Sequence, residues 1–406
     1  MSWAEAQMGD FFRVKHGYAF KGEFFDSQGS YVLLTPGSFN EEGGFRDQGE
    51  KTKYYTGDVP DGFVLDESDV VVAMTEQAPG LLGSSAWIPE DGRFLHNQRL
   101  GRIVNLDEHR LSKRYLYYLF NSRGVRVQIS ATATGGKVRH TAPERIAKVR
   151  FALPPLGVQN HIAHVLSDFD NLIENNRRRM ALLQEAAQHL HREWFVRFRF
   201  PGYEHTRITN GVPEGWEKTV LGSRFHTVLG GTPSRTRPDY WENGTVPWIN
   251  SGKVNELRVI EASEFITEKA LNASAAKLMP CGATLLAITG ATLGQVSFLE
   301  IECSANQSVV GIIDPSGLRS EFLYLTMRNR IDELVARATG GAQVHINKDI
   351  VNAFEIVLPH PRLAIQFKEQ INPVFRQVAS LMFQNEKLRA ARNLLLPRLM
   401  SGEITV

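Results

Sequence analysis

Few segments of this sequence combine the residue types and spacings that catalysis requires. The segment RPDYWEN, from Arg237, begins with the Pro-Asp pair of metal-dependent nuclease motifs, but the acidic-x-Lys that should follow is missing. The 406 residues also contain no Walker loop, no Asn-Pro-Pro-Tyr tetrad, no His-Glu-x-x-His and no Gly-x-Ser-x-Gly. Isolated acidic and histidine side chains could still meet in the fold, so an enzyme of unrecognised type remains an alternative.

Three segments instead carry donors that suit the binding of an anion. GGTPSRTR, from Gly230, joins flexible glycines to hydroxyl and guanidinium groups, which are the types that contact phosphate oxygens and guanine edges. ATGGKVRH, from Ala133, and ATGGAQVH, from Ala338, offer open backbone amides followed by polar side chains. Each segment could equally be a solvated loop or a structural turn, so the elements that position it must be considered.

The two ATGG segments belong to an internal repeat. A shift of 205 residues places the first on the second, and Leu153-Pro154 on Leu358-Pro359, without a gap. Upstream, Asn97-Gln98 recurs at Asn306-Gln307. We therefore expect two copies of one unit, whose front portions have diverged while the rear portions keep a common pattern.

The rear portion of each copy carries a heptad pattern. In the first copy, apolar residues alternate in steps of four and three from Ile162 to Trp194. In the second copy the same pattern runs from Phe367 to Leu395. This periodicity predicts two long helices that pair as an antiparallel coiled coil, related by an internal pseudo-twofold repeat.

A polar residue interrupts the seam of each helix, that is, the line of apolar residues in its heptad pattern. Asn176 and Asn385 are the polar members, and a shift of 205 does not superpose them. They could fix the register of the pair, facing each other or a polar rim, or could simply be exposed. Pro373 suits a first helical turn and would break a helix interior, so we expect the second long helix to start near Asn372.

The front portions predict α/β domains. Short β-branched runs such as DVVVAM, GRIVNL, ATLLAIT and SVVGIID are bounded by Gly, Pro, Asn or Asp, as is typical of strands. The expected fold class is α/β, with two such domains separated by the two long helices. The expected boundaries are 1–152 for the first domain, 153–200 for a central helical spacer, 201–215 for a linker, 216–357 for the second domain and 358–406 for a C-terminal helical spacer.

Composition restricts the class of protein. Two cysteines are too few for a disulfide framework or a Cys-rich zinc site. The chain has no run of about 18 apolar residues and no basic-then-apolar start, so a cytoplasmic protein without a membrane partner is expected. Its net charge of +2 means that local basic patches would have to hold any nucleic acid.

The helical segments resemble those of a known family. The segment LPPLGVQNHIAHVLSDFDNLIENNRRRMALLQEAAQHLHREWFVRFRFPGY, from Leu153, is similar to the central region of the specificity subunits of type I restriction-modification systems. The C-terminal segment from Leu358 resembles their distal region, and GGTPSRTRPDYWENGTVPWINSGKVNE looks like the opening of many of their target-recognition domains. The front domains otherwise cannot be matched residue by residue.

This resemblance implies a DNA-binding subunit without catalysis of its own. Each front domain, a target-recognition domain, would read one half of a split, asymmetric site in double-stranded DNA, and the paired helices would fix the gap. The implied partners are two methyltransferase (M) subunits and, in the full complex, restriction (R) subunits. The chain would need no cofactor; S-adenosylmethionine, and ATP with magnesium for restriction, would bind to the partner subunits.

The residues expected to contact DNA come from the segments above and, in part, from position alone. In the second domain they are Gly231, Thr232, Ser234, Arg235, Arg237, Asn250 and Lys253, with Thr339, Gly340, Gly341, Gln343, His345 and Lys348. In the first domain they are Lys15, Tyr18, Lys21 and Arg99, with Thr134, Gly135, Gly136, Lys137, Arg139 and His140. Core packing is expected for Tyr240, Trp241 and Trp248, and a solvated helix face for residues 177–179.

A second class of function fits the same pattern. A coiled-coil scaffold whose α/β domains bind protein or carbohydrate would show the same repeat and the same helices. It would lack a salt-dependent affinity for DNA, which is the property that separates the two classes.

Overall fold

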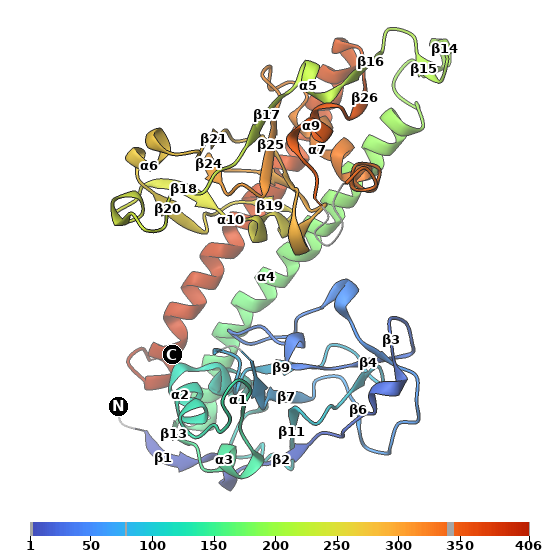
Figure 1. The fold of residues 1–406 in the computed structure, drawn as a ribbon. Coiled ribbons are helices and arrows are strands. Elements are labelled where there is room, and N and C mark those ends of the chain that lie inside the picture. The colour runs from blue at the N-terminus through green and yellow to red at the C-terminus, as the bar shows by residue number, and fades with distance from the viewer. Residues whose placement is uncertain (1–2, 78, 339–344, 406) are drawn as a thin grey trace. The chain divides into compact units, whose positions relative to one another are not determined.

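The chain is described by a computed structural model that covers residues 3–77, 79–338 and 345–405 (Figure 1). It divides into two compact units: unit 1 comprises Met1–Ile173 and Lys387–Val406, and unit 2 comprises Glu174–Glu386. Each unit contains one α/β domain and part of each long helix, α4 (Leu156–His191) and α10 (Pro361–Ser401). Within the described ranges, no helix is long and apolar enough to span a membrane.

The main sheets of the two domains share one strand order. Unit 1 has an antiparallel sheet ordered β2-β11-β7-β9, and the first four strands of the unit 2 sheet, β17-β25-β22-β23-β19, follow the same order. The unit 1 strands are β2 (Arg13–His16), β11 (Leu100–Val104), β7 (Val70–Ala73) and β9 (Ser85–Trp87). The unit 2 strands are β17 (His226–Leu229), β25 (Val309–Ile313), β22 (Thr284–Ala287), β23 (Val296–Leu299) and β19 (Arg258–Val259).

A second sheet repeats in the same way. The orders are β3-β5-β4-β10-β6 in unit 1 and β20-β18-β24-β21 in unit 2, each around one parallel pair, β4 with β10 and β18 with β24. The unit 1 strands are β3 (Phe25–Asp26), β5 (Tyr54–Tyr55), β4 (Tyr31–Leu33), β10 (Phe94–Leu95) and β6 (Val64–Leu65). The unit 2 strands are β20 (Glu264–Ile266), β18 (Val246–Ile249), β24 (Cys303–Ala305) and β21 (Leu278–Met279).

The ends of each domain meet just before its long helix. β1 (Ala4–Gln7) pairs antiparallel with β13 (Arg150–Leu153), and β16 (Glu217–Val220) pairs antiparallel with β26 (Glu355–Leu358). The helices repeat as well: α1 (Lys113–Asn121), α2 (Arg123–Ala131) and α3 (Pro143–Ala147) in unit 1, α7 (Ser320–Asn329), α8 (Ile331–Val335) and α9 (Lys348–Asn352) in unit 2. Unit 2 also has α5 (Leu221–Arg224) and α6 (Glu268–Ala273). The predicted internal repeat is confirmed by this shared topology.

The predicted pairing of the long helices is also confirmed. In unit 2, Trp194, which follows α4 in a π-helical turn (Arg192–Val196), packs on Phe367 near the start of α10, with ring centroids 5.6 Å apart. In unit 1, Ile162 near the start of α4 shares a buried core with Leu399 near the end of α10. Low numbers of one helix therefore meet high numbers of the other, which makes the pair antiparallel.

The start of the second long helix differs from the expectation. α10 begins at Pro361 and continues through Pro373, so the prediction of a start near Asn372 is wrong. An internal proline costs about 3 kcal/mol, but Phe367, Ile371 and Phe375 are each at most 4% exposed and contribute about 1.5–3 kcal/mol each. Pro373 itself is exposed, so the hydrogen bond that it cannot donate is missing on the solvent side.

The two domains are attached to the helices by different chemistry. In unit 1, Asp170 of α4 accepts a hydrogen bond from the Tyr118 hydroxyl of α1 at 2.7 Å and pairs with Arg392 of α10 at 2.6 Å. In unit 2, the ring of Phe375 of α10 lies 4.1 Å below the Arg258 guanidinium and 5.1 Å from the Phe298 ring. These contacts differ, but both attachments also bury apolar side chains, and unit 2 adds a hydrogen bond of 2.9 Å between His191 and Thr326.

Candidate nucleic-acid interface

Three distant segments of the first domain meet where β7 ends. The amide of Met74 donates to the Arg99 carbonyl at 3.0 Å, and the amide of Thr141 donates to the Met74 carbonyl at 2.9 Å. Next to them, the Thr75 hydroxyl lies 3.1 Å from Nδ1 of His140. This junction brings together Arg99 and His140, two candidate DNA ligands from separate parts of the sequence.

The second domain forms the same junction at the end of β22. The amide of Ile288 donates to the Ser308 carbonyl at 2.9 Å, and the amide of Ile346 donates to the Ile288 carbonyl at 2.9 Å. A β-bridge joins Thr289 to His345, as β8 (Thr75–Glu76) pairs with β12 (Arg139–His140) in unit 1. We call the two sites together the duplicated junction.

A glycine approaches the backbone beside each junction. A Cβ at Gly17 would lie 2.0 Å from the Asn97 carbonyl oxygen, and a Cβ at Gly230 would lie 2.1 Å from the Asn306 carbonyl oxygen. Only glycine permits this approach. The following residues also correspond: the amide of Tyr18 donates to the His96 carbonyl, and the amide of Gly231 donates to the Ala305 carbonyl. The repeated Asn-Gln segment therefore marks a repeated backbone contact.

The first ATGG segment is a tight hairpin. Thr134 and His140 exchange backbone hydrogen bonds of 2.9 and 2.7 Å. Gly135 has φ +106°, and a Cβ there would lie 2.1 Å from the Val138 carbonyl oxygen. Gly136 and Lys137 are exposed. The hairpin is thus built by its backbone, and Lys137 is available to contact a ligand. In the second copy, Thr339, Gly340, Gly341 and Gln343 lie outside the described residues.

A buried carboxylate that the sequence did not reveal holds this hairpin. Glu76 is 2% exposed, and its Oε2 accepts the backbone amides of residues 80–82 at 2.9–3.0 Å. Its Oε1 pairs with Arg139 Nη1 at 2.9 Å, and Arg139 Nη2 donates to the Ser130 carbonyl at 2.6 Å. Arg139 therefore joins the hairpin to a loop and a helix, and no local pattern around Glu76 signalled this role.

His96 is a second buried residue that sequence reasoning missed. It is fully buried, its Nε2 lies 3.0 Å from the Leu100 carbonyl, and its Nδ1 has no hydrogen-bond partner among the residues that the structure describes. Burial lowers the pKa of His96 to about 4. The imidazole is therefore neutral at pH 7, and it supports the backbone beneath Tyr18 without adding charge.

The basic residues of the GGTPSRTR segment are engaged within their own domain. Arg235 forms a bidentate pair with Glu264 at 2.5 and 2.8 Å, and its guanidinium lies 3.5 Å from the Trp241 ring centroid. Arg237 pairs with Asp239 at 2.8 Å. Hydrogen bonds from Arg237 and Lys269 hold the pKa of the Asp239 carboxyl well below its usual range. These arginines order the segment, and their contact with DNA stays a prediction.

The aromatic residues near this segment lie as expected. Tyr240 and Trp248 are 5% and 3% exposed and belong to one buried cluster, against which the partly buried Trp241 packs. The indole of Trp248 donates to the Gly231 carbonyl at 3.2 Å, and that of Trp241 donates to the Ser234 carbonyl at 3.1 Å. The predicted core packing is confirmed, and it fixes the path of the glycine-rich segment.

Other candidate residues of the second domain also have partners nearby. The Thr232 hydroxyl donates to Oε1 of Gln307 at 2.6 Å, and the Ser234 hydroxyl lies 2.9 Å from that of Thr236. Asn250 accepts the amide of Gly252 at 2.9 Å. Lys253 pairs with two carboxylates, those of Glu256 and Glu261. Lys348 is the first residue of α9 and forms no ion pair with any described residue.

In the first domain, the candidate DNA ligands chosen by position alone differ in whether their side chains already have a partner within the protein. Lys15 donates to the Gly62 carbonyl at 2.8 Å, and Tyr18 is 38% exposed. Lys21 lies 3.7 Å from Glu23 in an exposed pair. Arg99 is exposed and, among the described residues, has no carboxylate partner. The junction thus brings together Arg99 and the hairpin, whereas the contacts of Lys15 and Lys21 are with Gly62 and Glu23.

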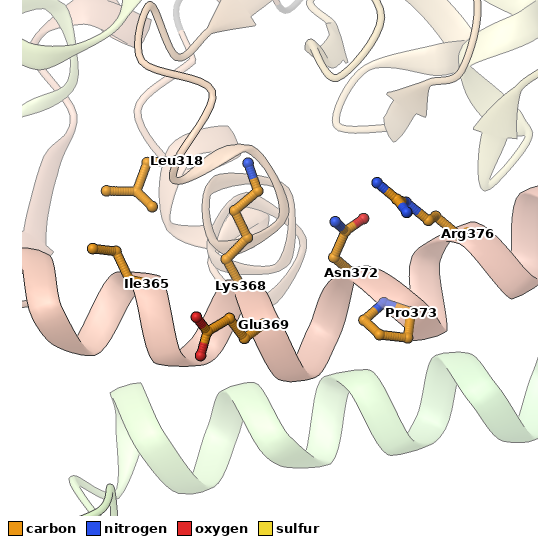
Figure 2. Close-up of a pocket in the computed structure, with 7 residues that line it drawn as sticks. All are labelled: Leu318, Ile365, Lys368, Glu369, Asn372, Pro373 and Arg376. Atoms are coloured by element: carbon orange, nitrogen blue, oxygen red, sulfur yellow. The ribbon is translucent and has the colours of Figure 1, made fainter.

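A groove of about 350 Å³ lies along α10 in unit 2 (Figure 2). Lys368, Asn372 and Arg376 project from the side of the helix on which Leu318 of the domain lies. Lys368 donates to the Gly317 carbonyl at 2.7 Å. Ile365 and the exposed Pro373 also line the groove, so it presents both apolar and basic groups at the surface of the long helix.

Comparison with known proteins agrees with this duplicated architecture. A family model described as type I restriction modification DNA specificity domain matches residues 1–185 and 213–371. The MjaIX specificity subunit of Methanocaldococcus jannaschii is 29% identical over 319 residues, which cover 76% of this chain and 73% of that protein. The EcoBI specificity subunit of Escherichia coli is 24% identical and covers 100% of this chain and 86% of its own length.

A solved structure shows the same fold. The S subunit of a type I restriction-modification system from M. genitalium superposes with a TM-score of 0.58. The alignment covers 98% of this chain and 96% of that chain, at 14% sequence identity. The likeness therefore concerns the arrangement of the two domains' elements and not individual residues.

Proposed function

Because this chain belongs to the family of type I restriction-modification DNA specificity domains, we propose that it is the non-catalytic specificity subunit of such a complex. Its ligand is double-stranded DNA, and each α/β domain reads one half of a bipartite, asymmetric site. The duplicated junction is the observation that carries this proposal, because one chain with two copies of a frame presents two readers. Different side chains around each junction then give different half-sites.

The readers are proposed to act through the exposed groups around each junction. Arg99 and Lys137 in the first domain are exposed and have no described ion-pair partner. Arginine and lysine side chains contact phosphates or the major-groove edge of guanine. Residues already held in ion pairs, such as Arg139, would instead keep the reading surface in shape.

The long helices are proposed to set the gap between the half-sites and to dock the partner subunits. Two M subunits, and R subunits where DNA is cut, are the expected partners. The groove beside Pro373 supports docking. Residue 373 has no N–H, so the Glu369 carbonyl lacks an intrahelical donor and can accept a hydrogen bond from a partner subunit. S-adenosylmethionine, and ATP with magnesium, would bind to those partners and not to this chain.

An exchange of one domain tests this function. Replacing residues 216–357 with the matching segment of a relative should change one half of the methylated sequence and preserve the other half. The reciprocal exchange of residues 1–152 is the matched control and should change the opposite half. The methylated sites are identified by sequencing genomic DNA for modified adenine. An exchange that alters both halves would contradict the two-reader proposal.

Salt dependence separates this function from that of a scaffold. For a DNA-reading complex, the logarithm of the affinity should fall linearly with the logarithm of salt concentration, by about 0.9 for each phosphate contact. The complex with the M subunit is titrated against specific and scrambled duplexes at several salt concentrations. A chain that binds protein or carbohydrate instead would show no specific binding in this titration.

A further inference from the structure

One layer of the helix seam is polar. Nδ2 of Asn176 in α4 donates to Oδ1 of Asn385 in α10 at 2.9 Å, and the two residues are 6% and 1% exposed. Trp194 and Phe367 lie eighteen residues further along the pair and are also in contact, so the register is constant through unit 2. In this register Met180 lies opposite Leu381.

The internal repeat makes this polar layer asymmetric. The shift of 205 residues carries Asn176 onto Leu381 and Met180 onto Asn385, so the two helices have one asparagine each at different positions of the seam. Other corresponding positions are apolar in both helices: Ile162 and Phe367, Leu166 and Ile371, Ile173 and Val378, and Leu183 and Leu388. Those apolar layers do not distinguish one helix from the other.

A second copy of the chain therefore offers each helix an alternative partner. If α4 paired with α4 of another copy in this register, Asn176 would face the other copy's Met180, and this would occur twice in the pair. If α10 paired with α10, Asn385 would face the other copy's Leu381 twice. The hydrogen bond between the two buried amides would then be lost, which is unfavourable. Only the pairing of α4 with α10 places amide against amide.

We propose that the Asn176–Asn385 layer is a pairing discriminator: it directs α4 to α10 and disfavours the α4–α4 and α10–α10 pairings that would join two copies. A single polar layer specifies partners in coiled coils in this way, at a cost in stability. The duplicated chain needs such a device, because its two helices otherwise present the same apolar seam.

An ion pair in unit 1 makes an independent contribution to the same discrimination. Arg392 of α10 is paired with Asp170 of α4 at 2.6 Å. The shift of 205 residues places Phe375 where α4 has Asp170. In a pair of two α10 helices, Arg392 would therefore meet an aromatic ring in place of the Asp170 carboxylate.

Co-expression of two differently tagged full-length copies measures this discrimination. The complex is purified through one tag, and the fraction that carries the other tag is quantified. The variant Asn176→Leu/Asn385→Leu makes every helix pairing apolar in this layer. It should increase the mixed fraction at least tenfold, which corresponds to about 1.4 kcal/mol, and it should melt no lower than the wild type.

The chain provides a matched control next to the layer. Asn175→Leu/Gln384→Leu adds similar apolar side chains at exposed positions outside the seam and should leave the mixed fraction at the wild-type level. An equal rise in both variants, or no rise in the seam variant, would overturn the proposal. This readout does not involve DNA, so it can fail while the specificity function holds.

The single variant Asn385→Leu gives a second measurement. It leaves Asn176 facing leucine within the chain but removes the mismatch from an α10–α10 pair. The melting temperature should therefore fall while the mixed fraction rises. A fall in melting temperature with an unchanged mixed fraction would assign the asparagines to stability alone.

Discussion

Glu76 offers a direct test of how the first domain is held in shape. Its buried carboxylate receives the amides of residues 80–82 on one oxygen and Arg139 on the other. Glu76→Gln removes the charge and replaces one acceptor oxygen with a donor NH2 group. Either the amides of residues 80–82 or Arg139 then loses its acceptor. Breaking a buried ion pair costs about 3–5 kcal/mol. Because the Arg139 side chain is 31% exposed and can be solvated, we expect about 3 kcal/mol.

This loss has a thermal and a DNA-binding readout. The melting temperature of unit 1 should fall by about 6–12 °C, since 1 kcal/mol shifts a domain of this size by about 2–4 °C. The complex with its partner subunits should no longer bind the correct sequence of one half-site more tightly than a scrambled one, and should still do so at the other half-site. The matched control, Glu23→Gln, removes an exposed carboxylate 3.7 Å from Lys21 and should change neither readout.

Two results would refute this reasoning. Unchanged melting of Glu76→Gln would show that the carboxylate does not hold the loop and the hairpin together. Lost discrimination at both half-sites would show that the network does not serve a single reader. The comparison uses duplexes in which each half-site is scrambled separately, so the two outcomes are distinguished in one titration.

Acid and glycine substitutions give two further predictions. Burial lowers the pKa of His191 to about 3, whereas the unfolded residue titrates near 6.5. The unfolded state therefore binds the extra proton, and the free energy of unfolding should fall by up to about 1.4 kcal/mol per pH unit below pH 6.5; urea titrations of His191→Gln should lack this contribution. Gly17→Ala and Gly230→Ala, which place a Cβ 2.0 and 2.1 Å from a carbonyl oxygen, should each abolish discrimination at one half-site. Gly124→Ala is the control, because its Cβ meets nothing within 4 Å, and it should preserve both half-sites in methylome sequencing.

The helices and the repeat could be predicted because their signals are local and periodic. The steps of four and three from Ile162 to Trp194 require burial along one face, and Ile162, Ile173 and Trp194 are at most 5% exposed. Pro373 misled the same reasoning, because a local rule about proline was outweighed by the burial of neighbouring aromatic and aliphatic side chains. Local propensity fails where tertiary packing supplies more free energy.

The partners of the candidate DNA ligands could not be predicted in this way. Arg235 has the chemistry of a phosphate ligand, but its carboxylate partner, Glu264, lies 29 residues away in the sequence and is brought near by strand pairing. Glu76 and Arg139 are 63 residues apart. Long-range ion pairs of this kind leave no spacing pattern, so a list of basic residues cannot tell which of them order a loop and which remain exposed.

The duplicated junction explains how the two domains can keep one frame while their sequences diverge. Its hydrogen bonds join backbone groups, with Met74 and Arg99 in one unit replaced by Ile288 and Ser308 in the other. Main-chain donors and acceptors are present whatever the side chain, so substitution at these positions does not disturb the geometry. The glycine that approaches the asparagine carbonyl is the exception, because any Cβ would collide there. Under the proposed function, sequence readout would therefore come from the side chains that the frame presents, and Arg99 in one copy against Ser308 in the other would contribute to two different half-sites.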